Sequence, residues 1–173
     1  MLDVIFNCIV VLGIFCMFFI SPACMSIGLV RLSNESFKIS RHERTMCLIP
    51  VCNYFYSNYR YSKSAFSIAG FSTIVLISTL IVRFIVMFFM YDNELMQTIT
   101  IYLFLASCLL FWICQAITIF KVLGDSGLYT FGARLFNAVT VIIGHIQVGY
   151  WLPRKMYYYT KKKGNKESLY ERD

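Results

Sequence analysis

One arginine stands within an apolar stretch of this chain, and its charge needs an explanation. Arg83 is the only charged residue between positions 65 and 90. A charge at the centre of a bilayer costs about 2.5–3.5 kcal/mol, and such residues commonly pair with another charge or serve a pore or a sensor. Arg83 lies seven residues before Met90, about 10 Å along a helix, and Asp92 and Glu94 follow that end. With the N-terminus outside the cytoplasm, Asp3 would lie at the same end. The sequence favours a structural ion pair or a charge that snorkels to the membrane surface; a charge that gates a pore is the alternative.

Polar residues recur at steps of three or four between positions 128 and 152. Such steps place side chains on one face of a helix, and a polar face within lipid must contact protein or water. We expect this face to hold copies of the chain together by interhelical hydrogen bonds; the alternative is the wall of a hydrated path. The polar face comprises Thr130, Arg134, Asn137, Thr140, Gly144 and Gln147, and the preceding apolar stretch offers a matching face of Thr100, Ser107, Gln115 and Thr118.

Catalytic and metal-binding groups are sparse. An intramembrane protease needs a serine with a partnered histidine or a pair of aspartates, and a membrane zinc enzyme needs clustered histidines and acids. The chain has two histidines, His42 and His145, without an HExxH motif, and none of its nine acids lies within a long apolar stretch. We therefore expect no enzymatic activity, no cofactor and no metal site. His145 lies just off the polar face and is expected to be a packing residue, with pH sensing as the alternative.

Long apolar stretches set the fold class. The chain of 173 residues is 58% hydrophobic and only 14% charged. Three stretches exceed the roughly 20 apolar residues that cross a bilayer. We predict an all-α, polytopic membrane protein, a bundle of four membrane-embedded helices without a sizeable soluble domain. The three long spans are expected at 4–30, 65–90 and 95–120, and a more polar fourth helix at 128–152, so that a helical transmembrane domain (1–153) precedes a basic tail (154–173).

The first span carries small residues on one face. Ser21, Cys24 and Gly28 are spaced so that another helix can approach closely, and Pro22 predicts a kink or an early exit. Residues 31–64, which follow this span, are rich in tyrosine and in basic residues. Tyrosine favours the headgroup zone, because one end of its side chain is polar and the other apolar. We therefore expect an interfacial loop that leads into the second span.

Basic residues give conflicting topological signals. Cytoplasmic segments are rich in Lys and Arg, and both the 31–64 loop and the 154–173 tail are basic, whereas the turn with Asp92 and Glu94 has no basic residue. Four crossings would separate the two basic segments. Three crossings, with the fourth helix re-entrant or lying in the interface, would keep both in the cytoplasm. The sequence leaves both arrangements open, and we favour four crossings.

The basic segments are the expected contact sites for lipid or for a partner. Near an anionic membrane surface, each lysine or arginine contributes about 1 kcal/mol of attraction. An acidic cytoplasmic protein is the second expected partner, and nothing in the sequence indicates direct nucleic-acid recognition. The residues concerned are Arg41, Arg44, Arg60, Lys63, Lys161, Lys162 and Lys163.

These features predict a non-enzymatic membrane subunit. It would self-associate and present its basic cytoplasmic segments to a soluble partner, as the anchor or sensor of a larger assembly. Small membrane proteins of this build serve bacterial secretion, conjugation and phage-defence systems, so by analogy we expect the bacterial inner membrane. The alternative is a gated or holin-like pore, formed by a homo-oligomer in which Arg83 and the polar face line the path.

Overall fold

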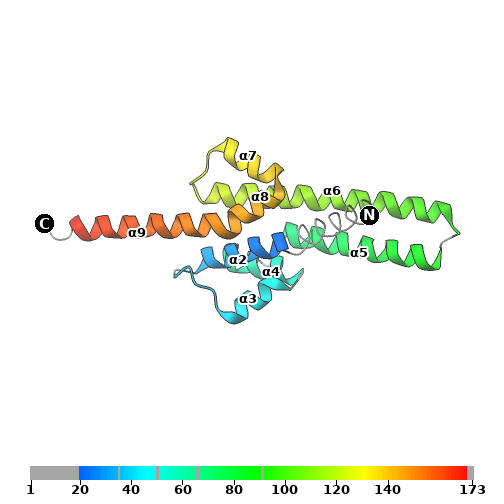
Figure 1. Cartoon of the computed structure of the whole chain (residues 1–173), viewed down its shortest axis with the longest axis horizontal. Helices are drawn as coiled ribbons and strands as arrows, with labels where there is room; N and C mark the ends of the chain where they lie inside the picture. The colour runs from blue at the N-terminus through cyan, green and yellow to red at the C-terminus, as the bar shows by residue number, and fades with distance from the viewer. Residues whose placement is uncertain (1–19, 35, 50, 65–66, 91, 171–173) are drawn as a thin grey trace, which may run out of the picture.

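The chain folds into helices that extend along one long axis (Figure 1). The computed structural model describes residues 20–34, 36–49, 51–64, 67–90 and 92–170, with side chains through Lys161. In these parts of the chain the regular elements are helices, with no strand. Of the first expected span, 4–30, the portion before residue 20 lies outside the described residues.

Two long antiparallel helices form a hairpin, as the sequence predicted. Helix α5 (Ile68–Phe89) and helix α6 (Glu94–Asp125) match the second and third expected spans. Among the described helices, these two are long and apolar enough to cross a membrane, and a third crossing is added if the bent pair described below counts as one span. The chain therefore has the character of an integral membrane protein. At 32 residues, α6 is about 48 Å long, well beyond the roughly 30 Å of a hydrocarbon core.

The expected single helix at 128–152 was wrong, because the chain bends sharply within it. The region holds α7 (Phe131–Val139), α8 (Val141–Ile146) and a π-helix, η2 (Gln147–Trp151). The chain turns by 115° between α7 and the helical stretch that starts at Val141. Consecutive β-branched residues at 139–142 weaken the helix there. The expected tail continues the same helical rod as α9 (Leu152–Tyr170).

The expected interfacial loop contains two short helices. Helix α3 (Arg41–Leu48) and helix α4 (Cys52–Ser62) fill most of 31–64, and α4 packs along helix α2 (Ser21–Ser33). The tyrosines of α4 divide between two environments: Tyr54 is buried in the core, whereas Tyr59 is exposed. The segment is thus a structured part of the bundle, and only some of its tyrosines are free to meet headgroups.

A reciprocal cap starts α3 and makes its stability depend on pH. The Ser40 N–H donates to the Glu43 carboxylate at 2.8 Å, and the Glu43 N–H donates to Ser40 Oγ at 3.2 Å. The hydrogen bond from the Ser40 backbone is the main cause that holds the pKa of Glu43 below its usual value, and Arg60 adds to it. A carboxyl whose folded pKa is lowered stabilises the fold at neutral pH, and this stabilisation is lost as the pH falls through the folded pKa.

We therefore expect α3 to fray below about pH 4, near the ordinary pKa of glutamate. Amide hydrogen exchange of residues 41–48, corrected for the intrinsic pH dependence of exchange, should show weaker protection at pH 3.5 than at pH 6. The Glu43→Gln variant should be less protected than the wild type at pH 6 and should change little between the two pH values. Equal protection of the wild type at both pH values would contradict this role of Glu43.

The helices other than the hairpin pack around one half of it. The core gathers side chains from α2, α4, α5, α6, α8, η2 and the start of α9, at the end of the hairpin away from its turn (Figure 1). The half of the hairpin nearer the α5–α6 turn has apolar residues exposed on its outer sides. Lipid is the medium that matches such a surface. The core comprises Met25, Leu29, Tyr54, Ala69, Ile119, Val122, Leu123, Val141, Val148 and Leu152, and examples of the exposed set are Ile81, Phe84, Phe88, Tyr102 and Leu109.

The small-residue face of α2 is used as the sequence predicted. A Cβ built on Gly28 would lie 2.5 Å from the Cα of Gly149 and 2.8 Å from the carbonyl carbon of Val148, so η2 crosses α2 in backbone contact. Gly149 in turn packs against Cys24. The glycines allow a crossing that larger residues would block.

Candidate functional site

Helix α6 carries polar side chains at three levels, and each level contacts a different partner. Thr100 bonds to Arg83 of α5, Ser107 bonds to Thr79 of α5, and Gln115 bonds to His145 of α8. The sequence had assigned all three α6 residues to a face that matches the fourth segment. Only Gln115 reaches that segment, at His145, which lies off the predicted polar face, because α5 covers the other two.

Neutral oxygen atoms surround the guanidinium of Arg83. Its Nη1 donates to Thr100 Oγ1 and to the Gln97 carbonyl, each at 3.0 Å, and also to the Gln97 side-chain oxygen. Gln97 Nε2 donates in turn to the carbonyl of Val86 at 3.1 Å, near the last turn of α5. Gln97 therefore joins the arginine to the end of the neighbouring helix.

The expected ion pair between Arg83 and the acids of the turn is absent among the described residues. Asp92 and Glu94 are both exposed, and the ion pair found in the described parts of the chain joins Arg60 to Glu43 instead. The acids lie beyond the turn of α6 that Arg83 reaches. The predicted ion pair with Asp92 or Glu94 is thus corrected in favour of a hydrogen-bonded charge, and Asp3 lies outside the described residues.

The register of the hairpin shows which way Arg83 points. Thr79 and Ser107 share a hydrogen bond of 2.7 Å between their hydroxyl oxygens. In an antiparallel pair this places the backbone of Arg83 opposite Leu103, four residues closer to the turn on each helix. The guanidinium reaches Thr100 and Gln97, which lie further toward the turn. Arg83 therefore snorkels toward the α5–α6 turn without leaving the helix pair.

A second polar cluster joins three helices in the core. Ser21 Oγ of α2 lies 2.6 Å from His145 Nδ1 of α8, and His145 Nε2 lies 3.1 Å from Gln115 Oε1 of α6. His145 and Gln115 are fully buried, and Ser21 nearly so. Sequence reasoning had considered these residues separately, because their contact depends on the 115° bend that brings α8 between α2 and α6.

The order serine, histidine, amide resembles a nucleophile with its base and an orienting group. Burial argues for a structural role, since only 5% of Ser21 and none of His145 is exposed, so a substrate carbonyl has no approach to the hydroxyl in this conformation. We interpret the cluster as a tie between α2, α6 and α8.

Two buried polar atoms lie beside the tie with incomplete hydrogen bonding. The Tyr54 hydroxyl faces Gln115 and Thr73 without forming a hydrogen bond of good geometry with either, and Gln115 Nε2 also lacks a partner among the described residues. Burial raises the pKa of Tyr54, so its hydroxyl remains a neutral donor. On the side that faces α4, the cluster therefore has buried hydrogen-bonding groups without a partner among the described residues.

The continuous polar face expected in the fourth segment does not form, because the bend at Thr140 divides it. Before the bend, Arg134 lies 5.5 Å from the centroid of the Phe120 ring, and Asn137 Nδ2 donates to the Ala133 carbonyl at 2.7 Å. These side chains are used within α6 and α7. They contribute no common face with the residues that follow.

At and after the bend, the remaining members of that face also have partners within the chain. Thr140 Oγ1 donates to the Phe136 carbonyl at 2.6 Å, and Gln147 Nε2 donates to the Tyr129 hydroxyl. A Cβ on Gly144 would overlap the carbonyl oxygen of Asn137 and lie 2.8 Å from the Ile119 side chain. The close packing at the bend therefore leaves no room for a side chain at Gly144.

The predicted basic contact residues occupy different surroundings. Arg60 donates to Asn34 Oδ1 at 2.8 Å and to Glu43 at 2.9 Å, so it joins α4 to α3 and to the end of α2. The others with described side chains are exposed on α3, at the end of α4 and on α9: Arg41, Arg44, Lys63 and Lys161. Lys162 and Lys163 continue α9 beyond the described side chains.

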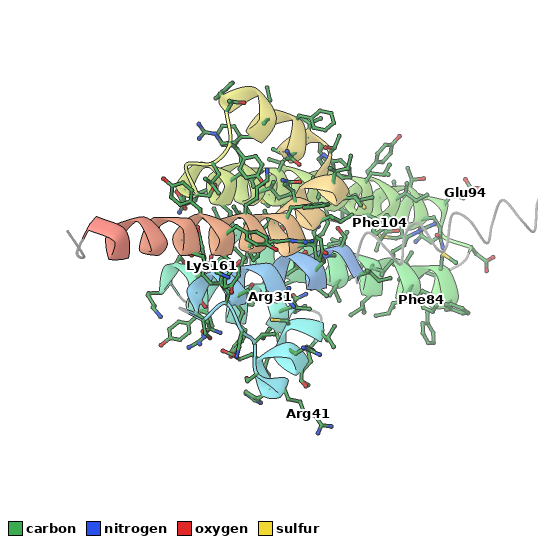
Figure 2. The ribbon with its side chains drawn as sticks, turned by 60° about the vertical axis from the view of Figure 1, so that its left-hand side comes forward. Arg31, Arg41, Phe84, Glu94, Phe104 and Lys161 are labelled. Carbon is green, nitrogen blue, oxygen red and sulfur yellow. The ribbon has the colours of Figure 1, made fainter. Side chains whose placement is uncertain are left out.

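The two basic segments lie away from the α5–α6 turn. Figure 2 shows Arg31, Arg41 and Lys161 away from Glu94, which marks the opposite end. The rings of Phe37 and Tyr157 meet edge to face with centroids 5.9 Å apart, which connects the segment after α2 to α9.

Comparison of this chain with protein-family models, with curated proteins and with solved structures finds no match.

Proposed function

We propose that this protein is a non-enzymatic integral membrane subunit that self-associates and presents one combined basic surface to a soluble partner. The observation that carries the proposal is the contact between Phe37 and Tyr157, which brings the first basic segment and the tail together at the end opposite Asp92 and Glu94 (Figure 2). The combined surface comprises Arg41, Arg44, Lys63 and Lys161.

A re-entrant fourth segment reconciles this surface with the charge rule for topology. Helices α5 and α6 cross the membrane, and the 115° bend between α7 and α8 returns the chain toward the end where α6 finishes. The basic loop and α9 then both face the cytoplasm, as the enrichment of Lys and Arg in cytoplasmic segments requires. We therefore propose the arrangement with a non-spanning fourth segment in place of four crossings.

Reporter fusions at Asn93 and at the C-terminus test this topology. A reporter that works only outside the cytoplasm should be active at Asn93 and inactive at the C-terminus. A reporter that works only in the cytoplasm should show the opposite pattern. Insertion of the same reporters after Lys63 supplies the control, because that position should behave like the C-terminus. The same response at Asn93 and at the C-terminus would contradict the proposed arrangement.

The partner that fits the basic surface is an acidic cytoplasmic protein. Anionic lipid headgroups contact the basic residues that this partner does not bind. By analogy with small subunits of bacterial secretion and defence assemblies, we place the protein in the bacterial inner membrane. We expect the double variant Arg41→Glu, Arg44→Glu to reduce capture of an acidic soluble protein by about tenfold or more. The matched charge change Glu94→Lys, at the other end, should leave capture unchanged.

A gated pore is the second candidate function. It is favoured by the polar clusters that follow one another along the α5–α6 contact, Arg83 with Gln97 and Thr100 and then Thr79 with Ser107. Purified protein in liposomes would pass ions if copies of the chain line a path with these groups. An ion-tight bilayer at high protein content would contradict the pore and leave the anchor proposal standing.

A further inference from the structure

Arg83 is a cation within an apolar helix pair that has no negative partner in the described parts of the chain. Its hydrogen bonds go from Nη1 to neutral oxygens of Gln97 and Thr100. Those bonds satisfy donors but leave the charge uncompensated, and an uncompensated charge in a low-dielectric medium attracts an anion strongly. The residue is half-buried, so part of it is open to the surroundings of the hairpin.

We propose that Arg83 binds a carboxylate carried by a transmembrane helix of a second, different protein. This inference rests on the proposed role as a membrane subunit and names the chemistry of one partner within the bilayer. The planar guanidinium has five N–H donors in a fixed fork, and Nε and Nη2 have no partner among the described residues. A carboxylate matches such a fork with two parallel hydrogen bonds.

The surface beside Arg83 suits the close approach of a helix. A shallow cleft of about 130 Å³ runs along the α5–α6 contact and is lined by Ser78, Thr79, Val82, Thr100 and Leu103. Three of these are small hydroxyl residues, which permit closer helix contact than leucine or phenylalanine does. The cleft meets the guanidinium at Thr100, which contributes to both.

The charges around the turn disfavour a lipid phosphate as the counterion. Asp92 and Glu94 are exposed at the membrane level that a headgroup on this side would occupy, and two carboxylates repel an anionic phosphate. The guanidinium also remains within the helix pair, bonded to Gln97 and Thr100, and does not extend past the turn. A carboxylate delivered from within the hydrocarbon avoids that repulsion.

A second copy of the described helices does not supply the carboxylate. Within α5 and α6 the acids lie at the ends of α6, as Glu94 and Asp125, whereas Arg83 stands opposite Leu103. An antiparallel neighbour made of these helices would place apolar residues at that depth, and a parallel neighbour would place its own Arg83 there, where two like charges repel each other. The partner helix is therefore expected to carry its own aspartate or glutamate about one-third of the way along its span.

A guest-helix experiment tests this assignment. The full chain, labelled with a donor fluorophore, is placed at pH 8 in phosphatidylcholine vesicles with a synthetic leucine-rich transmembrane helix that carries an acceptor. We expect a helix with one aspartate at the depth of Thr100, which the guanidinium reaches, to associate about tenfold more tightly than matched helices with asparagine or leucine. Arg83→Leu should lose this preference, while Arg134→Leu, which changes the arginine covered by Phe120, should keep it.

A charge-reversal variant distinguishes the loss of the ion pair from a failure to fold. Arg83→Glu should transfer the preference from the aspartate helix to an otherwise identical lysine helix. Equal association of all guest helices with the wild type would overturn the proposal, and so would loss of the aspartate preference when phosphatidylglycerol is added, because a lipid phosphate would then be the counterion. Neither result would affect the reporter positions or the soluble-partner capture that test the proposed function.

Discussion

Gly28→Ala is expected to break the crossing between α2 and η2 and to lower the free energy of unfolding by about 3 kcal/mol or more. Overpacking of a filled core costs typically about 1–3 kcal/mol, and the cost is largest where the obstacle cannot move. The new methyl group would lie 2.5 Å from the Cα of Gly149. That obstacle is backbone, so a change of side-chain rotamer cannot relieve the overlap.

Gly132→Ala is the matched control, because a Cβ at Gly132 meets nothing within 4 Å. Alanine is a better helix former than glycine by about 1 kcal/mol in a helix interior, so this variant should be as stable as the wild type or slightly more stable. Thermal unfolding in detergent, followed by the fluorescence of Trp112 and Trp151, measures both variants. Similar stability of the Gly28 and Gly132 variants would show that α2 and η2 do not touch as described.

His145→Ala is expected to be about as damaging as Gly28→Ala. It removes the residue that joins Ser21 to Gln115 and leaves the hydrogen-bonding groups of both without that partner. An unsatisfied buried polar group costs about 1–3 kcal/mol, and the lost ring volume adds a cavity term. We expect a total loss of about 3–5 kcal/mol, measured in the same unfolding assay. His42→Ala, an exposed histidine in α3, should change stability by less than about 0.5 kcal/mol.

A double-mutant cycle with Ser21→Ala isolates the link between α2 and α8. Because the serine hydroxyl and the imidazole share a 2.6 Å hydrogen bond, the two losses should fall short of additivity by about 1 kcal/mol. Additive losses would contradict the tie. Covalent labelling of Ser21 by a fluorophosphonate in native membranes, lost in His145→Ala, would instead show that the pair is catalytic and would overturn the proposal of a non-enzymatic subunit.

The hairpin was predictable because its signal is local and continuous. Hydropathy alone places the second and third spans within a few residues of α5 and α6, and Asn93, whose side chain accepts a hydrogen bond from the Met96 N–H, is an ordinary helix cap. The small-residue face of α2 was predictable for a similar reason, since the spacing of Ser21, Cys24 and Gly28 places all three on one side of a helix.

The bend at Thr140 was not predictable from periodicity. A run of polar residues at helical spacing looks the same whether the helix is straight or broken, and no proline marks the break. The bend depends on Gly144 lying against the carbonyl of Asn137 and on Ile119 of α6, which are tertiary contacts. Once the helix is broken, its polar side chains have partners within the chain and no longer share one continuous face.

The candidate site was also predictable only in part. The depth of Arg83 and its direction toward the turn followed from counting residues, and snorkelling needs no knowledge of the fold. Its partners did not follow, because Gln97 and Thr100 come from the neighbouring helix. The contact between Ser21 and His145 joins residues from opposite ends of the chain, so no local signal could have found it.

The wide turn of η2 determines the rotational phase of everything that follows it. The N–H of Leu152 donates to the carbonyl of Gln147, five residues earlier, one more than in an α-helix. One additional residue turns the following rod by about 100° around its axis. Tyr157 meets the Phe37 ring only in that phase. If the same residues formed a regular α-helix instead, every basic side chain of α9 would remain, but its aromatic side would point away from the first basic segment, and the two halves of the surface would be uncoupled.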